Sequence, residues 1–119
     1  MRQLTAGTGR LMITPPFDCE LSGFVAREGR SRGVHDPLYA RALVLADGKE
    51  KIALVSVDAL GVDAKLLAKV REKVAHLTDL NPSSVMISAT HTHSGPVTME
   101  DIFLGEVDPA YRNGLIKPL

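Results

Sequence analysis

Residues 38–58 read Leu38-Tyr-Ala-Arg-Ala-Leu-Val-Leu-Ala-Asp-Gly-Lys-Glu-Lys-Ile-Ala-Leu-Val-Ser-Val-Asp58, two apolar runs on either side of Asp47-Gly48. Short runs rich in Val, Leu and Ile are typical of strands, and Asp-Gly between two such runs is a strong hairpin signal. We therefore predict a β-hairpin with strands at residues 38–46 and 51–58.

The sequence after this hairpin predicts a helix and a further strand. Beyond Gly61, apolar residues recur at the spacing of one helix face: Leu66, Leu67, Val70, Val74 and Leu77. We expect this face to lie in the core. Asn81-Pro82 ends the helix, and residues 85–90 supply the next strand. Residues 51–90 then form a β-α-β unit with parallel strands.

These elements together predict an α/β fold with a mixed sheet. Residues 4–13 add a first strand, which ends at Thr14-Pro15-Pro16 because proline cannot donate a hydrogen bond to a sheet ladder. The long segment 17–37 is too polar and glycine-rich for a packed element. It is either a flap whose arginines contact a substrate or a solvated loop, and both interpretations stay open.

Composition limits the classes of function. The chain has 119 residues, of which 45% are hydrophobic, enough to form the core of about one domain. Acidic and basic residues number 14 each, so no charge excess points to a nucleic-acid partner. The single cysteine, Cys19, is expected to be a lone loop or edge thiol. Because no signal peptide and no apolar run of ~20 residues is visible, we expect a cytoplasmic protein without a transmembrane segment.

A histidine pair follows the last predicted strand, in Ser88-Ala-Thr-His-Thr-His-Ser-Gly-Pro96. Residues i and i+2 of a strand point to one face, so His91 and His93 aim at one point if the strand persists that far. Neutral imidazole is a common zinc ligand and a general acid or base near pH 7. The pair indicates hydrolytic metal chemistry, unless both histidines are loop residues that only make hydrogen bonds.

The predicted topology brings further polar residues to this histidine-bearing loop. The two parallel strands end at one edge of the sheet, and the antiparallel hairpin strand begins there. Ligands in open α/β sheets bind beyond the carboxyl ends of the parallel strands. We therefore predict a site at this rim from five residues: His35, Asp36, Asp58, His91 and His93. His35 and Asp36 either take part in it or only shape the rim.

Five segments carry a resemblance to a known family: Thr14-Pro-Pro16, Leu21-Ser-Gly-Phe24, Gly33-Val-His-Asp-Pro-Leu-Tyr-Ala-Arg-Ala-Leu-Val-Leu45, Val55-Ser-Val-Asp58 and Ala89-Thr-His-Thr-His-Ser-Gly-Pro96. By these segments the chain resembles the N-terminal part of the neutral/alkaline, non-lysosomal ceramidase family. The resemblance covers most of residues 4–100, and the histidine segment is its most specific part. It implies an enzyme that hydrolyses the amide bond of ceramide with one zinc ion held by two histidines, a glutamate and a tyrosine.

The same resemblance implies roles for the two histidines. His91 is expected to be the first zinc ligand, and His93 to contact the substrate or the developing oxyanion. Asp58 is expected to orient the ring of the ligating histidine. Some relatives are secreted or membrane-associated, and the implied substrate is a small N-acyl amide or a lipid.

The remaining zinc ligands are expected beyond residue 119. Asp108-Pro109 predicts the start of a helix, yet few residues follow it. We therefore expect residues 1–119 to be an N-terminal fragment of a larger catalytic domain. Catalytic zinc usually has three protein ligands, so this fragment is expected to be inactive until the rest of its chain, or a partner chain, completes the site.

Two rival functions stay open. A different metal-dependent hydrolase, for example of phosphoesters, would hold two ions between several histidines and aspartates. A binding or structural module would use the histidines only for hydrogen bonds. The apolar run Ile102-Phe103-Leu104 either walls an acyl-chain pocket or anchors the loop.

Overall fold

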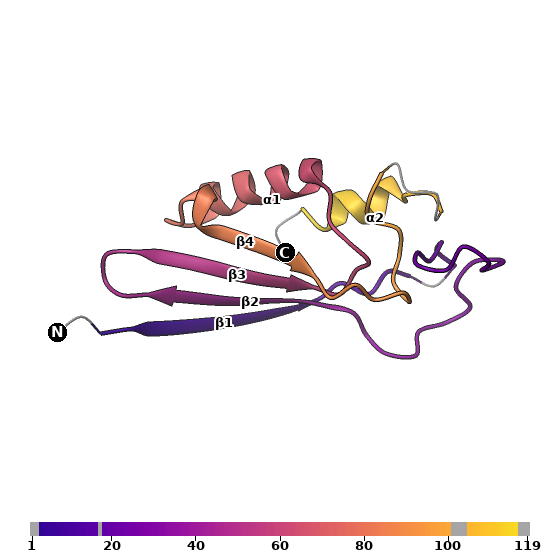
Figure 1. The fold of residues 1–119 in the computed structure, drawn as a ribbon, viewed down its shortest axis with the longest axis horizontal. Coiled ribbons are helices and arrows are strands. Elements are labelled where there is room, and N and C mark those ends of the chain that lie inside the picture. The colour runs from indigo at the N-terminus through magenta and orange to yellow at the C-terminus, as the bar shows by residue number, and fades with distance from the viewer. Residues whose placement is uncertain (1–2, 17, 101–104, 117–119) are drawn as a thin grey trace.

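Four strands form one mixed sheet in the order β1-β2-β3-β4 (Figure 1). The structure is a computed structural model and describes residues 3–16, 18–100 and 105–116. The strands are β1 (Thr5–Met12), β2 (Tyr39–Ala46), β3 (Lys51–Val57) and β4 (Val85–Ala89). β2 pairs antiparallel with both β1 and β3, and β3 pairs with β4 in parallel. The predicted α/β class, the hairpin and the β-α-β unit are confirmed.

The hairpin turn fixes the register between β2 and β3. The Asp47 carboxylate accepts hydrogen bonds from the backbone N–H groups of Lys49 (2.9 Å) and Glu50 (2.8 Å). Gly48 has φ of 87°, a left-handed conformation that glycine adopts without a steric cost. The resulting register pairs Ala40 with Val57, so the beginning of β2 lies beside the end of β3.

The helix α1 (Ala64–Leu77) covers one face of the sheet (Figure 1). It begins after Asp63, whose side chain accepts a hydrogen bond from the Leu66 N–H (2.8 Å) and so caps the first turn. Leu66 is buried, as predicted. The prediction that Leu77 lies in the core is wrong, because its side chain is 61% exposed at the last residue of the helix.

Another leucine takes the core position expected of Leu77. The chain leaves α1 at Thr78, and Leu80 then packs with Ala53 and Val85. A short 3-10 helix, η1 (Pro82–Ser84), follows and leads into β4. The helical stripe therefore packs on the sheet only as far as Val74, which lies against this cluster.

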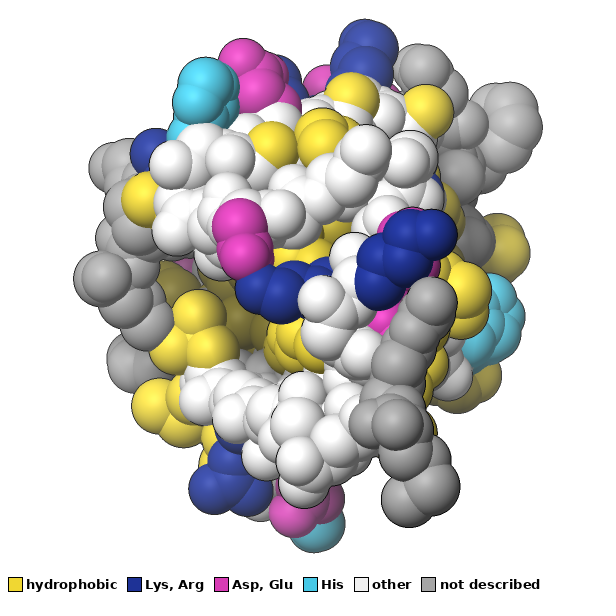
Figure 2. All heavy atoms as spheres, turned by 90° about the vertical axis from the view of Figure 1, so that its left-hand side faces the viewer, with side chains coloured by type: hydrophobic (Ala, Val, Ile, Leu, Met, Phe, Trp, Pro, Cys, Tyr) yellow, Lys and Arg dark blue, Asp and Glu magenta, His cyan; other side chains and the backbone are white. Residues whose placement is uncertain are grey.

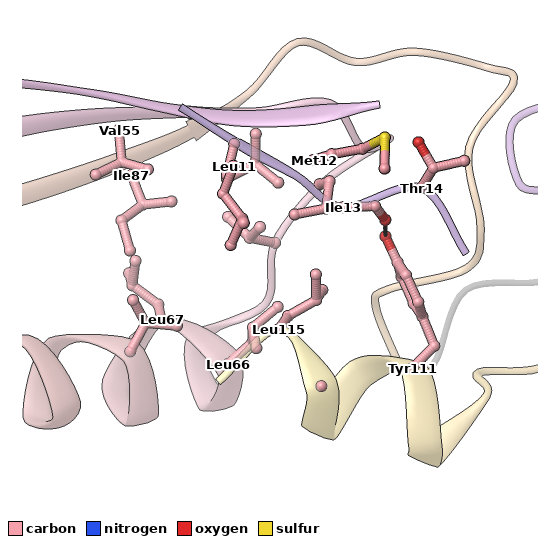
Figure 3. A pocket seen from close by; sticks show the side chains of 15 residues that line it. Leu11, Met12, Ile13, Thr14, Val55, Leu66, Leu67, Ile87, Tyr111 and Leu115 are labelled. Carbon is pink, nitrogen blue, oxygen red and sulfur yellow. Dashed lines mark hydrogen bonds between the residues drawn. The ribbon is translucent and has the colours of Figure 1, made fainter. Parts of the chain in front are cut away.

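The helix α2 (Pro109–Gly114) lies on the same side of the sheet as α1 (Figure 1). Asp108 caps it, as the sequence predicts, and the Tyr111 hydroxyl donates a hydrogen bond to the carbonyl of Ile13 (2.6 Å). The cavity between the sheet and the two helices has a volume of about 280 Å³ and an apolar lining that includes Leu11, Leu66 and Tyr111 (Figure 3). Burial raises the pKa of Tyr111 well above its ordinary value.

The two faces of the sheet differ in their cover. Seen from the end that carries the hairpin turn, hydrophobic side chains line a hollow between the helix layer and the sheet (Figure 2). On the other face, Ile52, Leu54 and Met86 are exposed, and none of the described helices packs there (Figure 1). Within the described ranges, no helix has the length and apolar character that a bilayer crossing requires.

Candidate functional site

The candidate site lies where β3 and β4 end side by side. Val57 and Ala89 form the last pair of the parallel ladder. Beyond it, the Thr90 N–H donates to the Val57 carbonyl (2.9 Å) and the Thr92 N–H donates to the Ala59 carbonyl (3.2 Å). The histidine-bearing loop therefore follows the residues after β3, and Asp58 and His91 leave the sheet at the same end.

His91 adopts an unusual backbone conformation and a defined ring orientation. Its φ is 64°, in the left-handed region that few residues other than glycine adopt, and such strain clusters at functional sites. Its Nδ1 lies 2.8 Å from the carbonyl oxygen of Leu60. Because a carbonyl oxygen only accepts, Nδ1 carries a proton, and in the neutral ring Nε2 then has the lone pair that a metal needs. Zinc-ligating histidines have this arrangement, with one ring N–H donated to the protein.

The two histidine rings come together although the strand does not reach them. β4 ends at Ala89, so the alternation of a strand does not place His91 and His93. The loop nevertheless brings their ring centroids to 4.9 Å, with the planes at 80°. The other neighbour of His93 is Phe24, whose ring centroid lies 5.1 Å away with the planes at 65°. The His93 ring is therefore flanked by two rings.

The backbone of Gly23 lies directly against His93. Gly23 has φ of 108°, and a Cβ atom built there would lie 2.6 Å from Cγ of His93. No larger residue fits this position without moving the histidine. Because Gly23 has no side chain, its backbone can contact His93, and the neighbouring Phe24 ring then lies beside the His93 ring.

Segment 21–27 is packed onto the histidine-bearing loop. Leu21 forms an isolated β-bridge with Pro96, and the N–H of the buried Ser22 donates to the Gly95 carbonyl (3.0 Å). The Arg27 guanidinium donates to the carbonyls of His93 (2.8 Å) and Ser22 (3.2 Å). As expected, the described part of residues 17–37 contains no helix or strand, but segment 21–27 still packs on the loop through backbone hydrogen bonds, the Arg27 guanidinium and the Phe24 ring.

Asp58 is held by β2. Its carboxylate accepts hydrogen bonds from the Tyr39 N–H (2.9 Å) and from the Arg41 guanidinium (2.9 Å). Burial raises the pKa of this carboxyl, but the Tyr39 N–H and the Arg41 charge outweigh it and hold the pKa below its usual value. The ring partner of His91 is the Leu60 carbonyl, in the place expected of Asp58. A role of Asp58 in a reaction stays a prediction.

His35 and Asp36 pair with each other rather than with the histidine pair. His35 Nδ1 lies 2.6 Å from the Asp36 carboxylate, and the His35 side chain is 98% exposed. Both residues line a groove of about 410 Å³ that Thr92 and Ser94 also line. Within the described ranges no hydrogen bond joins them to His91 or His93, and no three His, Cys, Asp or Glu side chains are grouped so as to hold a metal. The run 102–104 lies outside these ranges.

Sequence reasoning missed several residues that build this site. Arg41 carried a usable signal, because a charged residue inside an apolar strand needs a partner and the hairpin register brings it near Asp58. The Leu60 carbonyl gave none, since backbone groups leave no trace in a sequence. Gly23 and Arg27 precede His93, which both contact, by at least 66 residues, and periodicity does not reveal such long-range packing.

Comparisons with known proteins agree with this geometry. Residues 4–109 match the family model of neutral/alkaline non-lysosomal ceramidase, N-terminal. The neutral ceramidase of Drosophila pseudoobscura pseudoobscura is 33% identical over 96 residues, and that of Pseudomonas aeruginosa is 35% identical over 97 residues. Each alignment covers 76% of this chain but only 13% and 14% of the respective relative.

Solved structures give the same fold. The crystal structure of neutral ceramidase from Pseudomonas aeruginosa matches 98% of this chain with a TM-score of 0.83 and 22% identity. A ceramidase complexed with C2 matches with a TM-score of 0.78 and 23% identity. In both, the match covers 20% of the solved chain. The chain therefore belongs to the neutral/alkaline non-lysosomal ceramidase family and corresponds to its N-terminal part.

Proposed function

We propose that this chain is part of a zinc-dependent amidohydrolase that cleaves an N-acyl amide such as ceramide into a fatty acid and an amine. One observation carries the proposal: His91 donates Nδ1–H to the Leu60 carbonyl, its ring lies beside that of His93, and its Nε2 makes no hydrogen bond to the residues that the structure describes. The family match over residues 4–109 supports it, as do curated relatives that are neutral ceramidases.

The chain's own residues fit part of a zinc site. His91 would hold the ion through Nε2, and a bound zinc would polarise the amide carbonyl and lower the pKa of a water toward ~7. Because catalytic zinc usually has three protein ligands, the described residues do not complete the site alone. We place residues 1–119 at the beginning of a larger catalytic domain, with the missing ligands supplied by the rest of the chain or by a partner chain.

We propose that His93 acts on the substrate. Gly23 and Phe24 fix its ring on one side and His91 borders it on another, so its orientation is set before any substrate binds. A ring N–H held in this way can donate a hydrogen bond to the oxyanion that develops as the amide carbonyl is attacked. One such donor typically contributes about 10²–10³-fold to turnover.

The rival functions fit this geometry less well. A two-metal phosphoester hydrolase needs carboxylates beside the histidines. Asp58, the carboxylate that leaves the sheet beside them, is engaged by Tyr39 and Arg41. A purely structural histidine pair would use its ring nitrogens for hydrogen bonds, whereas Nε2 of His91 has no hydrogen-bond partner among the described residues.

A substrate panel tests the proposal. The full-length protein, meaning this chain joined to the rest of its catalytic domain, is assayed on ceramide, an N-acylethanolamine, an N-acyl amino acid and a phosphodiester. We expect zinc-dependent release of fatty acid from at least one amide and no turnover of the phosphodiester. The 119-residue chain alone should be inactive. Turnover of the phosphodiester alone, or no cleavage of any amide by the zinc-loaded protein, would refute the proposal.

A further inference from the structure

Arg27 joins residues 22–24, which we call the Ser22–Phe24 wall, to the histidine-bearing loop at His93. Its Nη2 donates to the His93 carbonyl (2.8 Å) and its Nη1 donates to the Ser22 carbonyl (3.2 Å). The guanidinium also lies over the Phe24 ring, 5.0 Å from the ring centroid. The Arg27 side chain thus contacts the backbone carbonyl of His93 and both ends of the Ser22–Phe24 wall, the Ser22 carbonyl and the Phe24 ring.

We propose that Arg27 is a positioning residue that sets the orientation of the His93 ring. This inference deepens the function proposed above and rests on it for its catalytic consequence. The position of Phe24 beside the His93 ring depends on where the Ser22–Phe24 wall is anchored. Arg27 anchors this wall to the His93 carbonyl. The Arg27 N–H closes the turn by donating to the Phe24 carbonyl (3.1 Å).

The loss of Arg27 leaves the fold anchored by other contacts. Ser22 keeps its hydrogen bonds to Gly95, and Leu21 keeps its bridge to Pro96. His91 keeps the Leu60 carbonyl. What disappears is the hydrogen-bonded link that Arg27 makes between Ser22 and the His93 carbonyl, while Gly23 and Phe24 still contact His93. The expected defect is therefore in the ring orientation of His93 and not in the fold.

Arginine suits this task better than lysine. Its planar guanidinium presents several N–H groups in a fixed fork, and two of them reach two different carbonyls here. A lysine has a single ammonium on a flexible stem, so it would keep the charge but hold one carbonyl well and the other poorly. The neighbouring Arg30 binds Asp18 and has a different task.

NMR of the histidine rings tests the inference without any enzyme assay. The chain has four histidines, and the exposed His35 and His76 serve as internal references. We expect Arg27→Gln to move the His93 ring signals toward those of His35 and His76, because Phe24 no longer stays in place beside the ring. Arg27→Lys should shift them less. Arg32→Gln, an exposed arginine of the same loop, is the matched control and should leave them unchanged.

Unchanged His93 signals in a folded Arg27→Gln chain would overturn the inference, as would an equal shift in Arg32→Gln. If Arg27→Gln disturbs all four histidines, the Arg27→Lys chain decides: a shift confined to His93 supports the inference, and no shift rejects it. In the full-length protein we expect kcat to fall about 10- to 100-fold in Arg27→Gln with little change in KM. Failure of the amidase assay leaves the NMR result valid, so the two proposals fail separately.

Discussion

At the scale of single residues, the site depends on polar contacts made to backbone groups. His91 uses the Leu60 carbonyl, Arg27 uses two carbonyls, and Asp58 binds a backbone N–H as well as Arg41. The sequence points to candidate site residues because histidine and aspartate are chemically distinctive. It does not identify the backbone groups that orient them, because every residue carries the same carbonyl and N–H.

The Asp58 contact gives a pH-dependent prediction. Although burial raises its pKa, the Tyr39 N–H and Arg41 bring the pKa below the usual value of 3.8. A carboxyl with a lower pKa in the folded state stabilises the fold fully above pH 3.8, and this contribution is lost as the pH falls through the folded-state pKa. We expect Asp58→Asn to lower the free energy of unfolding by about 1–2 kcal/mol at neutral pH.

Chemical denaturation at a series of pH values measures this effect. The difference in the free energy of unfolding between Asp58→Asn and the unchanged chain should become smaller as the pH falls below 3.8. Asp36→Asn, at an exposed carboxylate, should cost little at any pH. If the loss in the free energy of unfolding in Asp58→Asn stays constant down to acid pH, the charge of Asp58 contributes nothing to the stability of the fold.

At the scale of elements, periodicity predicts the strands and the helix, and local contacts fix where they end. The hairpin strands match the structure to within one residue because Asp47-Gly48 has strong turn chemistry. The helix begins after an aspartate cap, Asp63, two residues beyond Gly61. Leu77 fits the apolar stripe but is exposed, because periodicity does not show where the chain leaves the sheet.

Asp63 connects the helices α1 and α2 with the loop at Glu100 and gives a prediction at this scale. It caps α1, binds both Arg112 of α2 and the Glu100 N–H, and its pKa lies below the usual value because these contacts outweigh burial. We expect Asp63→Ala to lower the free energy of unfolding by about 2 kcal/mol, since it removes the cap and the ion pair. Asp63→Asn keeps a capping oxygen and should cost about half as much. If urea unfolding gives the same loss of free energy of unfolding for Asp63→Ala and Asp63→Asn, the capping oxygen contributes nothing to stability.

At the scale of the whole molecule, strand direction explains most of what the sequence could predict about the site. Two parallel strands must end at the same edge, and Asp58 and His91 both follow the end of the β3–β4 ladder there. His35 and Asp36 precede the neighbouring strand but lie in a loop whose path no strand fixes, and they form a separate exposed pair. This sequence covers 13–14% of the length of these curated relatives, so it does not identify the other ligands of the proposed zinc site.

The zinc content of the full-length protein tests the central claim, that His91 is a metal ligand, most directly. We expect about one zinc per chain in the unchanged protein and in His76→Ala, which alters an exposed histidine of α1. His91→Ala should lose both zinc and turnover. His93→Ala should keep most of the zinc and lose about 10²–10³-fold in turnover. Full zinc and full turnover in His91→Ala would contradict the account.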